Sequence, residues 1–215
     1  MNSRNPPAAS PLAHLAHLAH LVPLVRQARG PLAAALLALT AAVLCLSGPR
    51  PGRAQSPAEY EIKAAFMYNF AKFVQWPESA FAQPQSPLVL CVIGKDVFGP
   101  ALDTIDHKLA QGRELQVRRQ VRLEDARSCH ILFISESERP RLATIFKAVA
   151  AGSVLTIGDT DRFAESGGII GLYDLDEKVQ FSINLEQAHS ASLQINSQLL
   201  KLARIVRREP REDAQ

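Results

Sequence analysis

Three short runs of consecutive apolar residues constrain the fold of this chain more than any other feature. The runs are Leu88–Ile93, Ile131–Ile134 and Val154–Ile157, and Gly94 closes the first of them. An uninterrupted apolar run of this length is typical of a strand buried on both faces, as strands are in a parallel sheet covered by helices. The runs therefore predict an α/β fold.

Helical patterns precede and separate these runs. A helix is expected from the capping residue Ser56 to about Gln75, because Pro77 disfavours helical geometry in the residue before it. Its expected apolar face consists of Ile62, Phe66, Phe70 and Phe73. Further elements are expected as short helices near Phe98–Ile105 and after Ser135, and as a less apolar strand near Glu114–Arg118. Alternating strands and helices predict a single-domain sandwich with a mixed, mostly parallel sheet flanked by helices.

The pattern changes near the C-terminus. Apolar residues from Val179 to Leu185 alternate with polar ones, which is typical of a strand with one face exposed to water. We expect this strand to form a hairpin with Ile169–Tyr173 through a turn at Asp174–Glu177. A last helix is expected from Ser197 to Arg207. Its expected core face consists of Leu199, Leu202, Ala203 and Val206.

The first 54 residues have the features of a secretory signal. Arg26 and Arg29 precede an apolar stretch, and Gly52 and Ala54 place small residues before a cut ahead of Gln55. We therefore expect export to the periplasm, a mature domain over residues 55–208 and a frayed tail over 209–215. An uncleaved anchor, lipidation at Cys45 and a start codon assigned too far upstream stay open as alternatives, and we expect no metal site at His14, His17 and His20.

The net charge and the cysteine content of the expected exported part bear on its partners and on its disulfide bonding. The leader holds five arginines and no acidic residue, so its removal leaves 19 basic against 21 acidic residues, formally −2. Apart from a small basic cluster at Arg118, Arg119 and Arg122, interpreted as a solvated face, no electrostatic footprint for nucleic acid remains. Cys91 and Cys129 form an even pair in an oxidising compartment, which favours a disulfide over two buried free thiols.

No catalytic motif is present: there is no nucleophile elbow, phosphate-binding loop or zinc-binding helix motif. We therefore expect no enzyme activity, cofactor or metal. Two weaker alternatives are a carboxylate site at Asp159 and Asp161, as in an isolated hydrolase, and a small-anion loop at Gly94 and Lys95. An ordinary turn or helix cap is favoured at both places. Cys129 and His130 cannot pair as nucleophile and base, because neighbours in a strand point to opposite faces.

Six blocks of sequence together resemble the YfiR family of periplasmic proteins (DUF4154). The blocks are Tyr60–Pro77, Leu90–Gly94, Cys129–Ser135, Gly158-Asp159 with Phe163 and Gly167-Gly168, Phe181–Leu185, and Leu199–Val206. They cover nearly all of the expected mature chain and occur in the family's order.

The resemblance implies a non-enzymatic regulator. Such a protein represses an inner-membrane diguanylate cyclase of the GGDEF type by binding its periplasmic domain, and so limits cyclic di-GMP and biofilm formation. It implies release by an outer-membrane OmpA-like lipoprotein or by redox stress. Cys91 and Cys129 match the family's disulfide positions. A second cysteine pair that some members have near residues 158–168 is missing here, and Gly171–Tyr173 departs from the family's usual Asn-Phe, so redox control and surface specificity are not transferred.

Five residues are expected to contact the partner protein. Tyr68 and Trp76 lie partly off the core face of the first helix, and Phe163, Ile169 and Tyr173 surround the glycine pair and a half-exposed strand. Ordinary core packing is the alternative for all five. A homodimer and an extracytoplasmic small-ligand-binding module are further expectations that the sequence leaves open.

Overall fold

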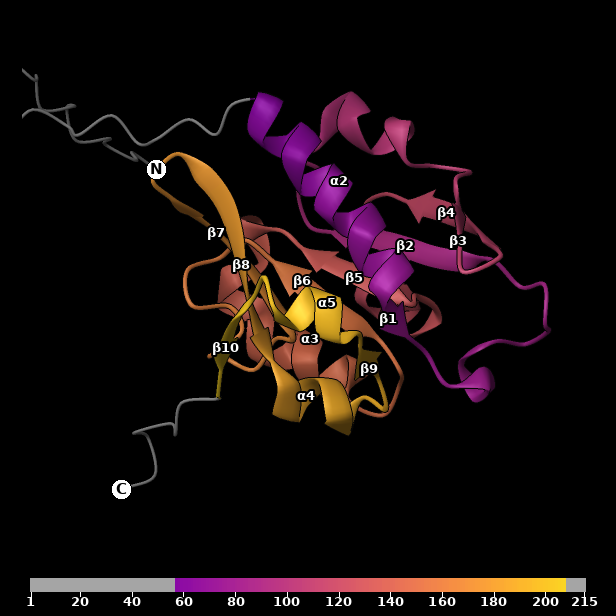
Figure 1. Cartoon of the computed structure of the whole chain (residues 1–215). Coiled ribbons are helices and arrows are strands. Elements are labelled where there is room, and N and C mark those ends of the chain that lie inside the picture. The colour runs from indigo at the N-terminus through magenta and orange to yellow at the C-terminus, as the bar shows by residue number, and fades with distance from the viewer. Residues whose placement is uncertain (1–56, 208–215) are drawn as a thin grey trace, which may run out of the picture. The chain divides into compact units, whose positions relative to one another are not determined.

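A computed structural model describes residues 57–207 of the chain (Figure 1). The expected signal segment 1–54, with its histidines, Cys45 and the cut at Ala54, lies outside the described residues, as does the expected tail 209–215. Within the described range, none of the helices combines the length and apolar character needed to span a bilayer.

An eight-stranded sheet forms the centre of the structure, in the order β10-β8-β7-β6-β5-β2-β4-β3. Its strands are β2 (Leu88–Ile93), β3 (Leu109–Ala110), β4 (Arg113–Arg118), β5 (Ile131–Ile134), β6 (Leu155–Gly158), β7 (Ile170–Leu175), β8 (Lys178–Asn184) and β10 (Arg204–Val206). Neighbouring strands are parallel except in the pairs β7–β8 and β3–β4. The mixed, mostly parallel sheet predicted from the apolar runs is confirmed.

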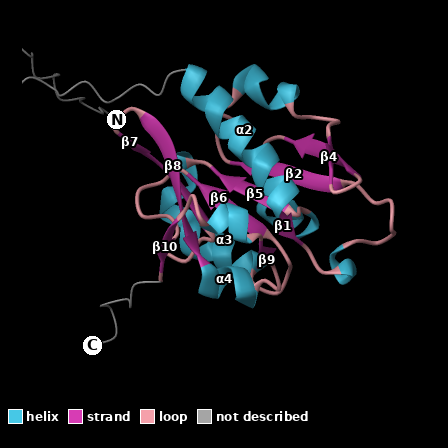
Figure 2. Ribbon diagram, in the orientation of Figure 1, coloured by secondary structure: helices cyan, strands magenta, loops and turns pink. Residues whose placement is uncertain are grey.

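Helices flank this sheet (Figure 2). The α-helices are α2 (Pro57–Phe73), α3 (Leu142–Val149), α4 (Leu185–Ser190) and α5 (Ser197–Leu200). Short 3₁₀ helices are η2 (Glu78–Ala80), η3 (Gly99–Thr104), η4 (Leu123–Ser128) and η5 (Glu136–Arg141). A small second sheet pairs β1 (Val74–Gln75) with β9 (Gln194–Ile195), which ties the end of α2 to the C-terminal part of the chain.

Strand β2 separates two hydrophobic cores. Its residues Leu88, Leu90 and Val92 pack in the core beneath α2, whereas Val89, Cys91 and Ile93 pack in a second core with α3. All six are buried, as expected for a strand covered on both faces. The second core contains the Cys91–Cys129 disulfide, with the two Cα atoms 5.9 Å apart, so the predicted pairing is confirmed.

The buried face of α2 differs from the predicted one. Ile62 is 48% exposed, and Phe66 and Phe73 are only partly buried. The residues that enter the core are Tyr60, Lys63, Ala64, Met67, Phe70 and Ala71. The helix is rotated relative to the hydropathy pattern because a lysine occupies the centre of its buried face, where it forms ion pairs described below.

The predicted last helix is wrong beyond its first turn. Asn196 caps α5 by accepting a hydrogen bond from the Gln198 N–H, but the helix ends at Leu200, and Leu202 is 75% exposed. The chain then forms β10, which pairs with β8 in parallel and places Ile205 beside Ile183. Pairing with a distant strand, at a β-branched segment, overrides the local helical spacing.

The predicted hairpin is confirmed as β7 and β8. Its turn residues Asp176 and Glu177 both have positive φ, 49° and 61°, as a type I′ turn of a two-residue hairpin requires. The second strand ends one residue earlier than predicted. Asn184 accepts a hydrogen bond from the Gln187 N–H and caps α4, so Leu185 begins a helix instead of ending the strand.

Candidate functional site

A buried cluster of charged side chains anchors α2 to the sheet. Lys63 Nζ lies 2.8 Å from Asp159 Oδ2 and 2.7 Å from Glu59 Oε1, and the Tyr60 hydroxyl donates to Asp159 Oδ2 at 3.2 Å. The Lys63 and Asp159 side chains are only 1% and 3% exposed. Because Asp159 directly follows β6, this cluster fixes the first turns of α2 over the carboxyl ends of the parallel strands.

The pKa values in the cluster follow from burial and charge. Burial acts to lower the pKa of Lys63, but the charge and hydrogen bonds of Asp159 and Glu59 outweigh it and raise this pKa above its usual value. Burial, followed by the charge of Asp159, raises the pKa of Tyr60. The lysine is therefore held charged and the tyrosine neutral.

The carboxylate alternative is not supported by this geometry. Asp159 is held by Lys63, whereas Asp161 is exposed. Among residues 57–207, no group of three or more His, Cys, Asp or Glu side chains is arranged to hold a metal ion.

Phe163 and Ile169 lie in the core, which agrees with the alternative of ordinary packing and leaves almost none of either side chain accessible to a partner. They are 1% and 3% exposed. The Phe163 ring lies between two glycines: a Cβ added at Gly158 would be 2.5 Å from it, and one added at Gly168 would be 2.1 Å from it. The two glycines leave the space that the ring occupies, so the segment that contains them and Phe163 serves to pack this ring in the core.

Replacing Gly168 by alanine is expected to lower the free energy of unfolding by about 2 kcal/mol, because the new Cβ would lie 2.1 Å from the buried Phe163 ring and force that ring to shift. Gly152→Ala is the matched control, since its Cβ would lie 3.4 Å from Val154 Cγ2 and 3.6 Å from the Val149 carbonyl oxygen, which are ordinary contact distances. Urea unfolding of both variants tests the difference. Equal stability would show that the ring can relocate.

Tyr68 and Trp76 are both partly buried, and their polar ends are bonded within the chain. The Tyr68 hydroxyl donates to the Leu109 carbonyl at 2.9 Å, and the Trp76 Nε1–H donates to the His130 carbonyl at 3.2 Å. Both residues cover the rim of the core beneath α2. Their role in partner contact stays a prediction.

His130 fastens the segment that follows Trp76 to the sheet. Its Nδ1 accepts from the Val89 N–H at 3.0 Å, so the ring proton is on Nε2, which lies 3.1 Å from the Ala80 carbonyl. The ring stacks on Phe81, whose other partner is the Arg113 guanidinium, 3.5 Å from the ring centroid. Burial lowers the pKa of His130, and the charges of Arg113 and Arg118 act in the same direction.

The free energy of unfolding should therefore fall on acidification, and protonation of His130 should account for part of the fall. Because its folded-state pKa lies below the unfolded value of about 6.5, the native state binds fewer protons, and the stabilisation present above that pH is lost as pH falls through the folded-state pKa. His130→Asn retains an acceptor for Val89 and should lose less stability between pH 7.5 and 5. Urea unfolding at both pH values measures the difference. An equal loss in the two proteins would contradict the assignment.

The segment that follows the neighbouring strand β5 packs against the Gly94–Lys95 loop. The Lys95 N–H donates to Ser137 Oγ at 2.9 Å, and Gly94 has a φ of +87° where a Cβ would lie 2.6 Å from the same oxygen. The nearby surface hollow is lined by Glu61 and Asp96 as well as by Lys95. These features do not favour an anion site.

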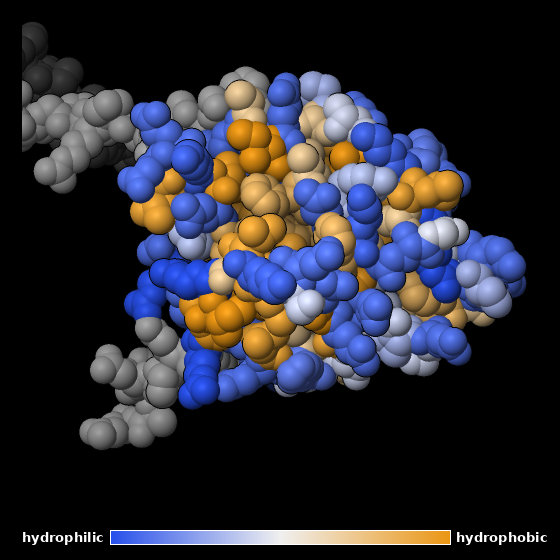
Figure 3. All heavy atoms as spheres, in the orientation of Figure 1, coloured by the Kyte–Doolittle hydropathy of each residue, from blue (hydrophilic) through white to orange (hydrophobic). Residues whose placement is uncertain are grey.

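The remaining candidate is a set of apolar residues on both faces of the outer strands, here called the edge surface: Ile62, Val179 and Ile205 on the side of α2, and Tyr173 and Leu175 on the opposite side. Ile62, Leu175 and Ile205 are each about half exposed, at 48%, 49% and 48%. Tyr173 is partly buried, with the Arg204 guanidinium 4.9 Å from its ring centroid. Figure 3 shows hydrophobic side chains gathered on the face that includes α5 and β10. Exposed apolar groups of this kind are typical of protein–protein contacts.

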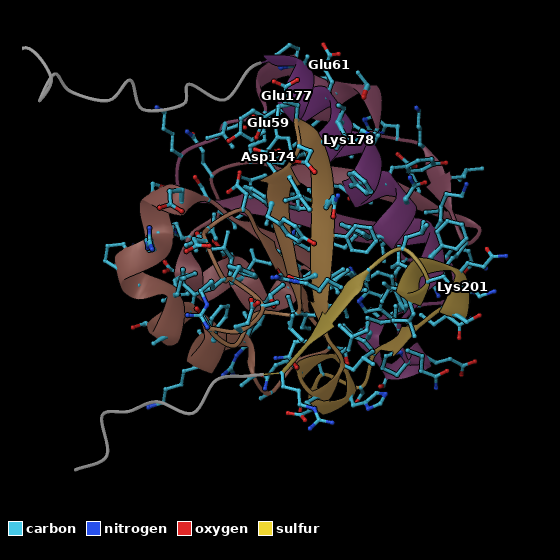
Figure 4. The ribbon with its side chains drawn as sticks, turned by 60° about the vertical axis from the view of Figure 1, so that its left-hand side comes forward. Glu59, Glu61, Asp174, Glu177, Lys178 and Lys201 are labelled. Atoms are coloured by element: carbon cyan, nitrogen blue, oxygen red, sulfur yellow. A yellow bond between two sulfur atoms is a disulfide. The ribbon has the colours of Figure 1, made fainter. Side chains whose placement is uncertain are left out.

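Acidic residues border the edge surface. Figure 4 shows Glu59 and Glu61 of α2 at the same end of the molecule as Asp174 and Glu177 of the hairpin. Glu61, Asp174 and Glu177 are exposed, as is Asp176 in the turn. The surface therefore combines apolar side chains with a negative border.

Comparison with known proteins identifies the family of this chain. The family profile DUF4154, described as YfiR/HmsC-like, matches residues 60–204. The chain belongs to the YfiR/HmsC-like family. No curated protein sequence matches it. A crystal structure of a conserved domain protein from Vibrio cholerae O1 biovar El Tor is similar at 10% identity and a TM-score of 0.42, covering 68% of this chain and 59% of that one.

Within this chain, several motif residues of the family are buried: Lys63, Asp159, Phe163 and Gly168 all serve packing or the charge cluster. The edge surface could not be recognised from the motif alone. The signal that pointed to it was the excess of apolar residues at the end of an amphipathic strand. Of the three residues that this signal selected, two lie in the core.

Proposed function

We propose that this YfiR/HmsC-like chain is a periplasmic, non-enzymatic regulator that represses an inner-membrane GGDEF-type diguanylate cyclase by binding its periplasmic domain. The family match over residues 60–204 is the observation that supports this most strongly. The edge surface supplies apolar and charged groups suited to a protein partner.

Repression is a population shift in this proposal. A regulator that binds the inactive geometry of the cyclase more tightly than the active one favours the inactive state by the difference in binding free energy. An outer-membrane OmpA-like lipoprotein that competes for the same regulator would release the cyclase. The groups that sequence patterns offer for catalysis have other partners: Asp159 pairs with Lys63, and Cys129 is in a disulfide.

The test is whole-cell cyclic di-GMP in a strain lacking this protein, with and without deletion of any neighbouring gene for a GGDEF-type cyclase. We expect a rise that disappears when the cyclase is also deleted. A level unchanged both at rest and under envelope stress would overturn the proposal and favour the small-ligand-binding module.

A further inference from the structure

The outer edge of β8 is open over half its length. β10 pairs only with the last part of the strand, matching Arg204–Val206 to Ser182–Asn184. Among residues 57–207, no strand pairs with the outer side of Lys178–Phe181. An open edge of this kind is a template on which another extended segment can add.

The backbone groups at this edge are fixed by the hairpin register. The Asn184 N–H donates to the Ile169 carbonyl at 2.8 Å, so the even-numbered residues of β8 point their backbone groups toward β7. Because the direction alternates along a strand, the backbone groups of Val179 and Phe181 point away from β7. The parallel pairing of Arg204 with Ser182 takes up the Phe181 carbonyl, so the N–H and C=O of Val179 and the N–H of Phe181 are offered to an incoming strand.

The side chains of the same residues give this edge an apolar face. Phe181 packs beneath α2, with its ring centroid 5.4 Å from that of Phe66. Val179 lies two residues nearer the hairpin turn and therefore on the same face, and Ile62 lies one helical turn before Phe66, toward the same end. Val179 is partly buried and Ile62 is 48% exposed. Phe181 is only 3% exposed, so a strand added here would place every second side chain against the accessible members of this apolar track, Val179 and Ile62.

The charges at the turn end specify the partner further. Glu61, Asp174 and Glu177 are exposed there together with Lys178 (Figure 4), and Asp176 is exposed in the turn between the strands. A segment with lysine or arginine beside its apolar residues complements this border, whereas an acidic segment is repelled.

We propose that the open β8 edge receives an extended segment of the partner protein, with alternating apolar side chains and flanking basic residues, as an added strand. This inference rests on the proposed function and names the contact through which repression would act. Backbone pairing would provide the affinity, and the apolar track with its acidic border would provide selectivity.

A defined peptide tests the edge directly. The probe is a heptapeptide of alternating valine and threonine with lysine at both ends, and the control carries glutamate at both ends. We expect the lysine peptide to bind residues 55–215, to slow hydrogen exchange at the Val179 and Phe181 amides, and to bind at least about threefold more tightly than the glutamate peptide at low salt. Equal binding of both peptides, or protection elsewhere only, would overturn the proposal.

Val179→Pro removes one outward N–H without removing a β7–β8 hydrogen bond, and proline is tolerated on edge strands. It should weaken lysine-peptide binding at least about tenfold, whereas Val179→Ala should keep most of it. Thermal unfolding of both variants checks the fold. Hydrogen exchange measured with the peptide, in wild type and in a variant that carries Glu61→Lys and Asp174→Lys, provides an arm that does not depend on proline. If the proline variant binds as wild type does, or if this edge proves to pair with a second copy of the chain, the inference is wrong.

Cellular measurements separate this inference from the proposed function. If wild type represses cyclic di-GMP and Val179→Pro does not, both stand. If the proline variant represses as well as wild type, the edge proposal fails while the repressor function survives. If wild type does not repress, the repressor function fails, and the peptide measurement still decides whether the edge binds a strand.

Discussion

Replacing Cys91 and Cys129 together by alanine is expected to lower the free energy of unfolding by about 4 kcal/mol. The bond closes a segment of 38 residues, and in the chain-entropy model a crosslink of this span reduces the freedom of the unfolded chain by about that amount. The loss is large beside the roughly 5–15 kcal/mol by which domains are stable. It should appear in urea as a lower midpoint.

Wild type unfolded and refolded in reductant is the matched control, because it breaks the same bond without removing sulfur atoms from the core. Both half-cystines are buried, at 0% and 3% exposure. Reductant should therefore act on the native protein only as fast as the protein opens. A double variant as stable as oxidised wild type would show that the unfolded chain is restrained by other means, and rapid reduction of the folded protein would contradict burial of the bond.

Local pattern predicted the parts of the fold that depend on continuous apolar runs. Leu88–Ile93 and Ile131–Ile134 are strands with the predicted bounds, because a strand buried on both faces needs apolar residues throughout. The disulfide followed from compartment and parity. These features require no knowledge of which distant residues meet.

Features that depend on distant partners were not predictable. Residues 201–206 have helical spacing, but Ile205 pairs beside Ile183, and the choice between helix and strand was made by β8. Phe163 is an aromatic residue, a type that occurs at interfaces as well as in cores. Only the two glycines that leave room for its ring identify it as a core residue. The spacing of Gly158 and Gly168 around it was the available signal.

The rotation of α2 has the same origin. Hydropathy places a lysine outside, yet Lys63 is among the largest fully buried side chains of residues 57–207, because Asp159, 96 residues away, lies beneath it. The edge surface follows from this rotation, since Ile62 is exposed only because Lys63 takes the buried position. The position of Asp159 directly after a strand marks it as a candidate site residue, but nothing in the local sequence identifies Lys63 as its partner.

Lys63→Met is expected to cost about 3–5 kcal/mol of stability, because it leaves the buried Asp159 carboxylate without its cation. Methionine retains most of the lysine's length and apolar contact, so the loss reports on charge more than on packing volume. Urea unfolding at pH 7 measures it.

Adding Asp159→Asn to Lys63→Met separates the charge from the side chain's shape. With neither buried charge of the central pair present, the double variant should recover a large part of the loss, since removing both members of a buried pair costs less than removing one. Glu59, at 12% exposure, lies nearer the surface and has more access to water. If the double variant is less stable than Lys63→Met, the Tyr60 and Asp159 hydrogen bond matters more than the ion pair. Full recovery of stability with loss of partner binding would show that the cluster sets the position of α2 beside the edge surface, so that the buried charges serve recognition through placement of Ile62.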